Sequence, residues 1–244
     1  MNKLRELLLT NRIAKIIEIF SIFLIALIII KVFVQTDGDN TLYNQIVVWI
    51  ANVVMLTMVW GGLKLRGQTW QDFGLSFKKA SLKEILNIFL RSLLVFVLAL
   101  SGFIFGSIIM ANITGIPEGA DLSGYDYLKD NIGMLILSLS GIYVVSSFGE
   151  EVIYRAFLIN RITELGLNSS KGRIIAVILS AIVFGLVHYS WGPMGIVQTG
   201  FMGLALGLCY IYMKRRLWIL ILAHAYLDTI LIVQIYLASN YSNP

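Results

Sequence analysis

Apolar side chains fill most of the chain and are interrupted by short polar segments. A helix needs about 20 mostly apolar residues to cross a bilayer. The runs that approach this length are 13–35, 43–63, 86–112, 132–163, 173–190, 194–213 and 217–238. The pattern therefore predicts an all-α polytopic membrane helix bundle of about seven transmembrane helices, or eight.

The composition supports a membrane protein. Hydrophobic residues make up 58% of the 244 residues and charged residues 14%, with a mean hydropathy of +0.82, against roughly 25% charged residues in soluble domains. The first run follows a charged start, as in a signal peptide, but it is too long and no small-residue cleavage site follows it. We expect it to remain as a membrane anchor.

Basic residues gather in alternate loops. The net charge is +5, and the positive-inside rule assigns such loops to the cytoplasm. The residues are Lys3, Arg5, Arg12, Lys15, Lys64, Arg66, Lys78, Lys79, Lys83, Arg161, Lys171, Arg173, Lys214, Arg215 and Arg216. This places the N-terminus inside and the C-terminus outside. Because no basic stretch interleaved with aromatics exists elsewhere, we expect no nucleic-acid partner.

Three local features concern packing. The amphipathic stretch 77–91 is either an interfacial segment or the cytoplasmic start of the third helix. Gly200, Gly203 and Gly207 form a small-residue face that a neighbouring helix can approach closely. Cys209 is the single cysteine, which excludes an intramolecular disulfide and favours simple packing.

Charged and titratable residues lie inside the predicted spans, where each costs about 2.5–3.5 kcal/mol on insertion scales. "FGEEVIYR" (148–155) contains Glu150, Glu151 and Arg155. Glu151 and Arg155 are four residues apart and can form an intrahelical ion pair, which leaves Glu150 free to face a cavity beside Tyr154.

The only two histidines of the chain also lie in predicted spans, His188 in "FGLVH" (184–188) and His224 in "HAYLD" (224–228). Asp228 lies four residues after His224, on the same helix face. Any one of these residues alone is explained by helix packing. Six of them on three spans indicate one water-filled site.

Two kinds of chemistry suit this set. A glutamate beside a histidine can take a proton from water and return it to a leaving amine, while a second histidine stabilises an oxyanion. Alternatively, Glu150, His188 and His224 form a ligand set for catalytic zinc. The spacing does not choose between them. The chain has no HExxH, GxSxG or GxGD motif, so other common hydrolase sites lack support.

The ordered motifs "EEVIYR" (150–155), "FGLVH" (184–188) and "HAYLD" (224–228) resemble those of the CPBP family, the CAAX prenyl endopeptidases and bacteriocin-processing or immunity proteins also called Abi. The resemblance covers about 132–238. It implies a catalytic core of four helices within 132–244, preceded by N-terminal helices and an interfacial segment in 1–131, all in one integral membrane domain.

The resemblance also implies roles for the site residues. Glu150 and His188 would activate water, His224 and Asp228 would bind the oxyanion or orient the water, and Glu151 and Arg155 would support them. The best-studied prenyl-protein members carry asparagine where this chain has Asp228. An ionised aspartate cannot donate to an oxyanion, so Asp228 would orient His224, bind a metal or stay protonated. Zinc therefore stays open as a cofactor.

The leading hypothesis is an intramembrane endopeptidase of a bacterial plasma membrane. Its substrate would be a membrane-associated peptide or protein, such as a pheromone or bacteriocin precursor. The alternative is a non-catalytic scaffold or bacteriocin self-immunity factor. A proton-coupled transporter predicts inverted repeats and broken helices in both halves of the chain, but the candidate site residues all lie in the second half.

The expected depth of His188 in the membrane conflicts with a single site that also contains His224. A helix that begins near Arg173 would place His188 about 22 Å along its axis at 1.5 Å per residue, whereas His224 lies near the start of its own span. We therefore expect the fifth helix to start shallower, to tilt, or to end within the membrane at "SWGP" (190–193), where Gly192 and Pro193 allow a break.

Overall fold

The computed structural model describes residues 3–36, 40–76, 80–115 and 123–241, and these contain helices and no strands. In chain order the elements are α1 (Lys3–Thr10), α2 (Arg12–Phe33), α3 (Thr41–Arg66), η1 (Trp70–Phe73), α4 (Leu82–Thr114), η2 (Ser123–Leu128), α5 (Ile132–Ile142), η3 (Tyr143–Ile159), α6 (Asn160–Thr163), α7 (Ser170–Leu186), η4 (Tyr189–Trp191), α8 (Gly192–Tyr212) and α9 (Leu217–Tyr241).

The fold is the predicted polytopic helical bundle. Among the described residues, six helical segments are long and apolar enough to cross a membrane. Each of the seven predicted runs corresponds to helix, but the fifth run gives only the 17 residues of α7. At 1.5 Å per residue α7 is about 26 Å long, slightly less than the roughly 30 Å of a hydrocarbon core.

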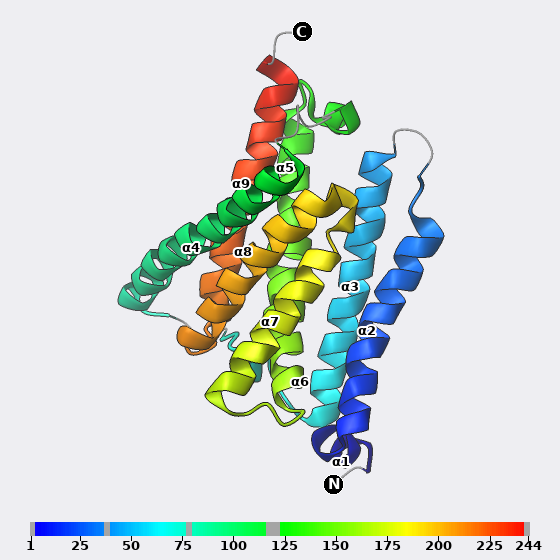
Figure 1. The fold of residues 1–244 in the computed structure, drawn as a ribbon, viewed down its shortest axis with the longest axis vertical. Coiled ribbons are helices and arrows are strands. Elements are labelled where there is room, and N and C mark those ends of the chain that lie inside the picture. The colour runs from blue at the N-terminus through cyan, green and yellow to red at the C-terminus, as the bar shows by residue number, and fades with distance from the viewer. Residues whose placement is uncertain (1–2, 37–39, 77–79, 116–122, 242–244) are drawn as a thin grey trace.

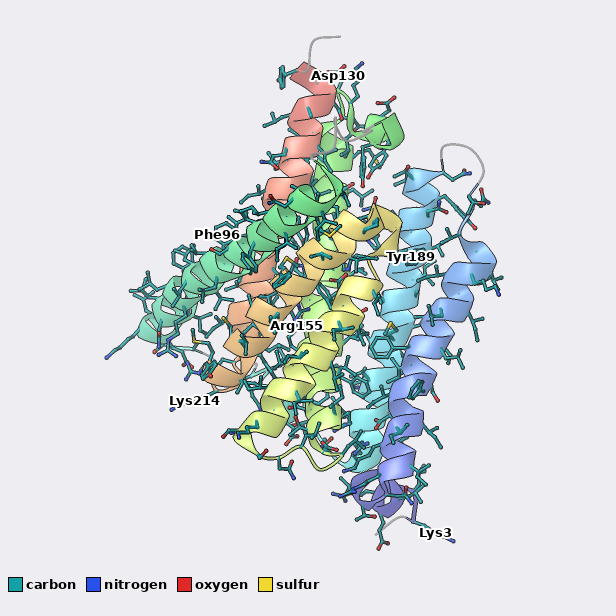
Figure 2. The ribbon with its side chains drawn as sticks, viewed as in Figure 1. Lys3, Phe96, Asp130, Arg155, Tyr189 and Lys214 are labelled. Atoms are coloured by element: carbon teal, nitrogen blue, oxygen red, sulfur yellow. The ribbon has the colours of Figure 1, made fainter. Side chains whose placement is uncertain are left out.

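The basic loops gather at one end of the bundle. Figure 2 shows Lys3 and Lys214 towards the lower end and Asp130 at the opposite end. The chain therefore has the charge asymmetry that the positive-inside rule requires. That this end faces the cytoplasm stays a prediction. Lys78 and Lys79, which belong to the same predicted set, lie outside the described residues.

Helix α4 crosses the bundle at a steep angle, in front of α9 in Figure 1. It starts at Leu82, where the Ser81 hydroxyl accepts a hydrogen bond from the backbone N–H of Glu84 at 3.2 Å, and it continues without interruption to Thr114. Residues 82–91 are therefore the first turns of the third membrane helix, the second of the two interpretations of this stretch. Residues 77–79 lie outside the described part of the chain.

Glycines bring three helices into close contact. A Cβ on Gly203 would lie 2.8 Å from the Phe184 ring, and one on Gly207 would lie 2.7 Å from Val177, so the glycine face of α8 packs on α7 as predicted. On another side of α8, a Cβ on Gly106 of α4 would lie 2.9 Å from the Gln198 Cα atom. Helix α8 thus lies between α4 and α7, and the helices approach so closely at these glycines that a larger side chain would not fit there.

Buried ion pairs join the N-terminal helices to the second half of the chain. Arg66 at the end of α3 is 1% exposed and pairs with Glu18 of α2 and with Glu164, 3.4 Å from its Nη1 atom. Arg161 of α6 contacts the same two carboxylates. One buried apolar cluster also includes residues of α2, α3, η3 and α9. Both segments of the chain therefore build one core.

Candidate active site

The segment that carries the two glutamates is a π-helix. Residues Tyr143–Ile159 form η3 between α5 and α6, and all residues from Glu151 to Ile159 are buried. A π-helix has i→i+5 hydrogen bonds and usually occurs as a single turn, often at functional sites. The sequence suggested ordinary α-helical geometry here. The difference has no local sequence signal, and the segment is packed against α3, α7 and α9.

Glu151 lies at the centre of the site and is fully buried. Its Oε1 atom is 3.1 Å from Nη1 of Arg155, the expected intrahelical ion pair. The same Oε1 atom lies 2.8 Å from Nδ1 of His224 on α9, which donates to it. A single carboxylate oxygen therefore neutralises Arg155 and also fixes the orientation of the His224 ring.

Asp228 lies on the other side of the His224 ring. Its Oδ1 atom is 3.7 Å from His224 Nε2, too far for a hydrogen bond. Its Oδ2 atom accepts a 2.6 Å hydrogen bond from the hydroxyl of Ser147 on η3. His224 Nε2 thus faces the Asp228 carboxyl group without a hydrogen bond to it.

The contacts between η3 and α9 recur every four residues along η3. Tyr143 bonds Thr229 at 2.7 Å, Ser147 bonds Asp228, and Glu151 bonds His224. The Tyr143 hydroxyl is the donor in its pair, because the Thr229 hydroxyl donates to the Ala225 carbonyl. This series of polar contacts holds the two helices in one register.

Glu150 has a different environment from its neighbour. Oε2 of Glu150 is buried and has no hydrogen-bond partner, as is also true of Oε2 of Glu151, but Glu150 as a whole is only partly buried whereas Glu151 is fully buried. The charges that act on Glu150 are those of His224, Asp228, Arg155 and Glu151. The carboxylate of Glu151 is fixed through Oε1 by Arg155 and His224, and Glu150 does not take part in these two contacts. Glu150 is therefore the glutamate that is available to bind a water or substrate atom.

His188 lies just beyond the end of α7. Its Nδ1 atom lies 2.7 Å from the carbonyl oxygen of Phe184. Because a carbonyl can only accept, Nδ1 carries the proton and Nε2 is left free. In Figure 1 the turn between α7 and α8 lies well below the C-terminal end of α9. The chain ends α7 at Leu186 and turns at Gly192 (φ 71°), so His188 lies in the turn between α7 and α8.

Phe184 connects the parts of the site. Its ring lies 4.8 Å from the His188 ring and 6.3 Å from the His224 ring, and the Arg155 guanidinium lies 4.1 Å from its centroid. Figure 2 shows Arg155 near the middle of the bundle. Phe184 thus separates the two histidines and covers the Arg155 cation.

The structure brings predicted site residues of η3, α7 and α9 close to one another, and the Phe184 ring contacts three of them, His188, His224 and Arg155. Glu151, Arg155 and His224 are in direct contact, Asp228 is next to His224, and His188 reaches the group through the Phe184 ring. No hydrogen bond joins Glu150 to His188. Sequence reasoning quoted Phe184 without assigning it a role and missed Ser147. The available signal was spacing, since Phe184 precedes His188 by four residues and Ser147 precedes Glu151 by four.

The zinc alternative was also tested against this arrangement. Within the described part of the chain, no three His, Cys, Asp or Glu side chains are grouped so as to hold a metal ion. Nδ1 of His188 bonds a carbonyl and Nδ1 of His224 bonds Glu151, so only the Nε2 atoms of the two histidines could bind a metal. The side chains as placed do not fit a metal, and we derive no step through one.

Residues 131–230 match the family model described as "Rce1-like: Type II CAAX prenyl endopeptidase Rce1-like". Over this range the chain is similar to the Rce1-like family. All six predicted site residues lie within the matched range, and the family indicates a CAAX-type intramembrane endopeptidase as the broad class of activity. No curated protein and no solved structure matches the chain.

The Rce1-like match begins at the first residues of α5 and ends within α9. It therefore contains η3, α7 and the part of α9 that carries His224 and Asp228. Helices α1 to α4 lie outside it. Their contribution to the site is structural, since α3 packs against η3 and α4 packs against α8 and α9.

Proposed function

We propose that the chain is an intramembrane endopeptidase in which Glu150 and His188 activate a water molecule. The observation that carries this proposal is the difference between the two adjacent glutamates. Glu151 is fully buried, and its Oε1 atom is bound to Arg155 and His224, whereas Glu150 is only partly buried. One glutamate organises the site and the other is free to take a proton.

The two histidines have complementary roles. His188 Nε2 is free, because Nδ1 bonds the Phe184 carbonyl, so Nε2 can accept a hydrogen bond from the attacking water. His224 lies between Glu151 and Asp228. A proton on its Nε2 atom would be stabilised by both carboxylates and would be donated to the oxyanion that forms on the attacked carbonyl.

The proton then follows a short route. Water attacks the carbonyl carbon of the substrate, and its proton passes to Glu150. When the C–N bond breaks, Glu150 returns this proton to the leaving amine. Asp228 orients His224, and Ser147 holds Asp228 in place by donating to one of its oxygens.

The substrate we propose is a peptide or protein that reaches the site from the membrane, such as a pheromone or bacteriocin precursor, in a bacterial plasma membrane. Five of the six residues lie within apolar helices, and His188 lies just beyond the end of α7. This supports the proposal, because a substrate must reach a buried site through the bilayer or from its surface. The basic end of the bundle would face the cytoplasm.

The test uses purified full-length protein and a library of quenched fluorescent peptides in detergent. Wild type, Glu150→Gln and His188→Ala are compared with and without a strong chelator. Cleavage that is lost in both variants and unaffected by chelator would support the glutamate mechanism. Cleavage that is lost with chelator and restored by zinc would contradict it in favour of a metalloprotease. Cleavage of a substrate by Glu150→Gln at the wild-type rate would reject the proposed role of Glu150.

A further inference from the structure

A basic cavity of about 510 Å³ lies outside the candidate active site, between the first turns of α4 and the turn that joins α8 to α9. Arg91 of α4 and Lys214 and Arg216 of the turn line it. None of the described residues that line the cavity carries a negative charge. Figure 2 shows Lys214 at this end of the molecule, next to the beginning of α4. Three cations without a lining carboxylate favour an anionic ligand.

The lining changes from polar to apolar along α4. Asn87, Arg91 and Leu94 line the cavity, and their spacing places them on one helix face. The same face continues with Leu98, which is 43% exposed. At 33 residues α4 is about 50 Å long, longer than a hydrocarbon core. Its first turns can therefore lie at the level of lipid headgroups while Leu94 and Leu98 lie among acyl chains.

The turn that presents the cations is held in an unusual backbone conformation. Lys214 and Arg215 have φ angles of 55° and 58°, a region that residues other than glycine rarely adopt. The turn is fixed by the segment after α3. The backbone N–H of Leu217 donates to the Gly74 carbonyl at 3.3 Å, and a Cβ on Gly74 would overlap the Arg215 carbonyl. Strained backbone of this kind clusters at ligand sites.

We propose that this cavity binds the phosphate of an anionic phospholipid. Arg91, Lys214 and Arg216 contact the phosphate oxygens, and the Tyr212 hydroxyl offers a further hydrogen bond to the headgroup. The acyl chains lie along Leu94 and Leu98. A lipid fits better than a soluble phosphate because the cavity continues into an exposed apolar helix face. Basic pockets between membrane helices are a recurrent form of headgroup site.

The experiment is a lipid titration of the full-length protein in detergent, followed by native mass spectrometry. The probes are phosphatidylglycerol and phosphatidylcholine with identical acyl chains. We expect the wild type to bind phosphatidylglycerol preferentially. Arg91→Gln together with Lys214→Gln should weaken that binding about thirty-fold, from the contribution of two basic residues near a headgroup. The matched control, Lys171→Gln with Arg173→Gln, removes the same charge from the loop before α7 and should leave binding unchanged.

Three outcomes would overturn the proposal. Equal binding of the two lipids by the wild type would exclude headgroup recognition, whatever the variants do. Equal weakening in the control variant would show attraction by net charge alone. Displacement of phosphatidylglycerol by inorganic phosphate at equal concentration would assign the cavity to the free ion. Thermal unfolding of each variant checks its fold, and because the substituted side chains lie at the surface we expect wild-type unfolding temperatures.

Discussion

His224 on α9 donates from Nδ1 to Oε1 of Glu151 on η3 at 2.8 Å, across 73 residues of sequence. The same oxygen lies 3.1 Å from Arg155. Because Oε1 of Glu151 has two fixed partners, it is poorly placed to take a proton from water. Glu150 retains that capacity.

Substitution of each glutamate by glutamine should therefore give different results. Glu150→Gln should reduce kcat by a factor of about 10²–10⁴, the usual contribution of a general base, and leave the unfolding temperature unchanged. Glu151→Gln leaves the buried Arg155 charge unpaired and should lower the free energy of unfolding by about 3–5 kcal/mol. Peptide cleavage and thermal unfolding in detergent measure the two effects. Equal destabilisation by both substitutions would mean that both glutamates are structural.

Asp228 provides a second test, because the best-studied prenyl-protein members of the CPBP family, which this chain resembles, carry asparagine at this position. Ser147 donates to Oδ2 of Asp228, and an asparagine carbonyl can accept the same hydrogen bond. We expect Asp228→Asn to retain most of the activity and Asp228→Ala to lose it. An Asp228→Asn variant as inactive as Asp228→Ala would show that the negative charge itself is needed.

Ser147 should act as a positioning residue. Ser147→Ala removes the 2.6 Å hydrogen bond to Asp228, and a hydrogen bond to a charged group contributes about 1.5–3 kcal/mol. We expect kcat to fall about tenfold or more with little change in KM, and Ser147→Thr, which keeps the hydroxyl, to restore it. Steady-state kinetics of the two variants measure these changes in kcat and KM. A fall in Ser147→Thr as large as in Ser147→Ala would indicate packing in place of hydrogen bonding.

The sequence predicted where the helices lie along the chain better than it predicted their backbone geometry. Run length alone located all seven apolar helices, because the bilayer sets a minimum span. An end of the fifth helix at "SWGP" was one of three alternatives, beside a shallower start and a tilt, that the expected distance between His188 and His224 suggested. The π-helical geometry of η3 was not predicted, since it depends on neighbours such as Leu56 of α3, which lies 3.2 Å from where a Cβ on Gly149 would stand.

The site was predicted as a set of residues and not as a set of contacts. Spacing of four residues identified the Glu151–Arg155 pair, and it suggested His224–Asp228 as a pair as well. The shorter contact of His224 is with Glu151 on another helix, which spacing within one helix cannot reveal. The position of the Phe184 ring between the two histidines likewise depends on how α7 packs against η3 and α9.

Arg66 should be important for stability, although it lies outside the family match. It is buried and pairs with Glu18 and Glu164, which join α2, α3 and the end of α6. Arg66→Met leaves these carboxylates without that partner and should lower the free energy of unfolding by about 3–5 kcal/mol. Lys64→Gln, an exposed site on the same helix, should change it by less than about 0.5 kcal/mol. Chemical denaturation in detergent compares them, and similar values for both would reject a structural role for the ion pairs.

Close packing of α4 on α8 can be tested by adding one methyl group. Gly106→Ala places a Cβ 2.9 Å from Gln198 Cα and from the Val197 carbonyl oxygen, distances that backbone atoms cannot relieve without moving the two helices apart. Gly61→Ala on α3 meets nothing within 4 Å and gains helix propensity. We therefore expect Gly106→Ala to lower the unfolding free energy by about 1–3 kcal/mol and Gly61→Ala to leave it equal or raise it. Thermal unfolding of the two variants measures the difference. A Gly106→Ala protein as stable as the wild type would mean that α4 can shift on α8, and that the first turns of α4 are not rigidly placed beside the turn that carries Lys214.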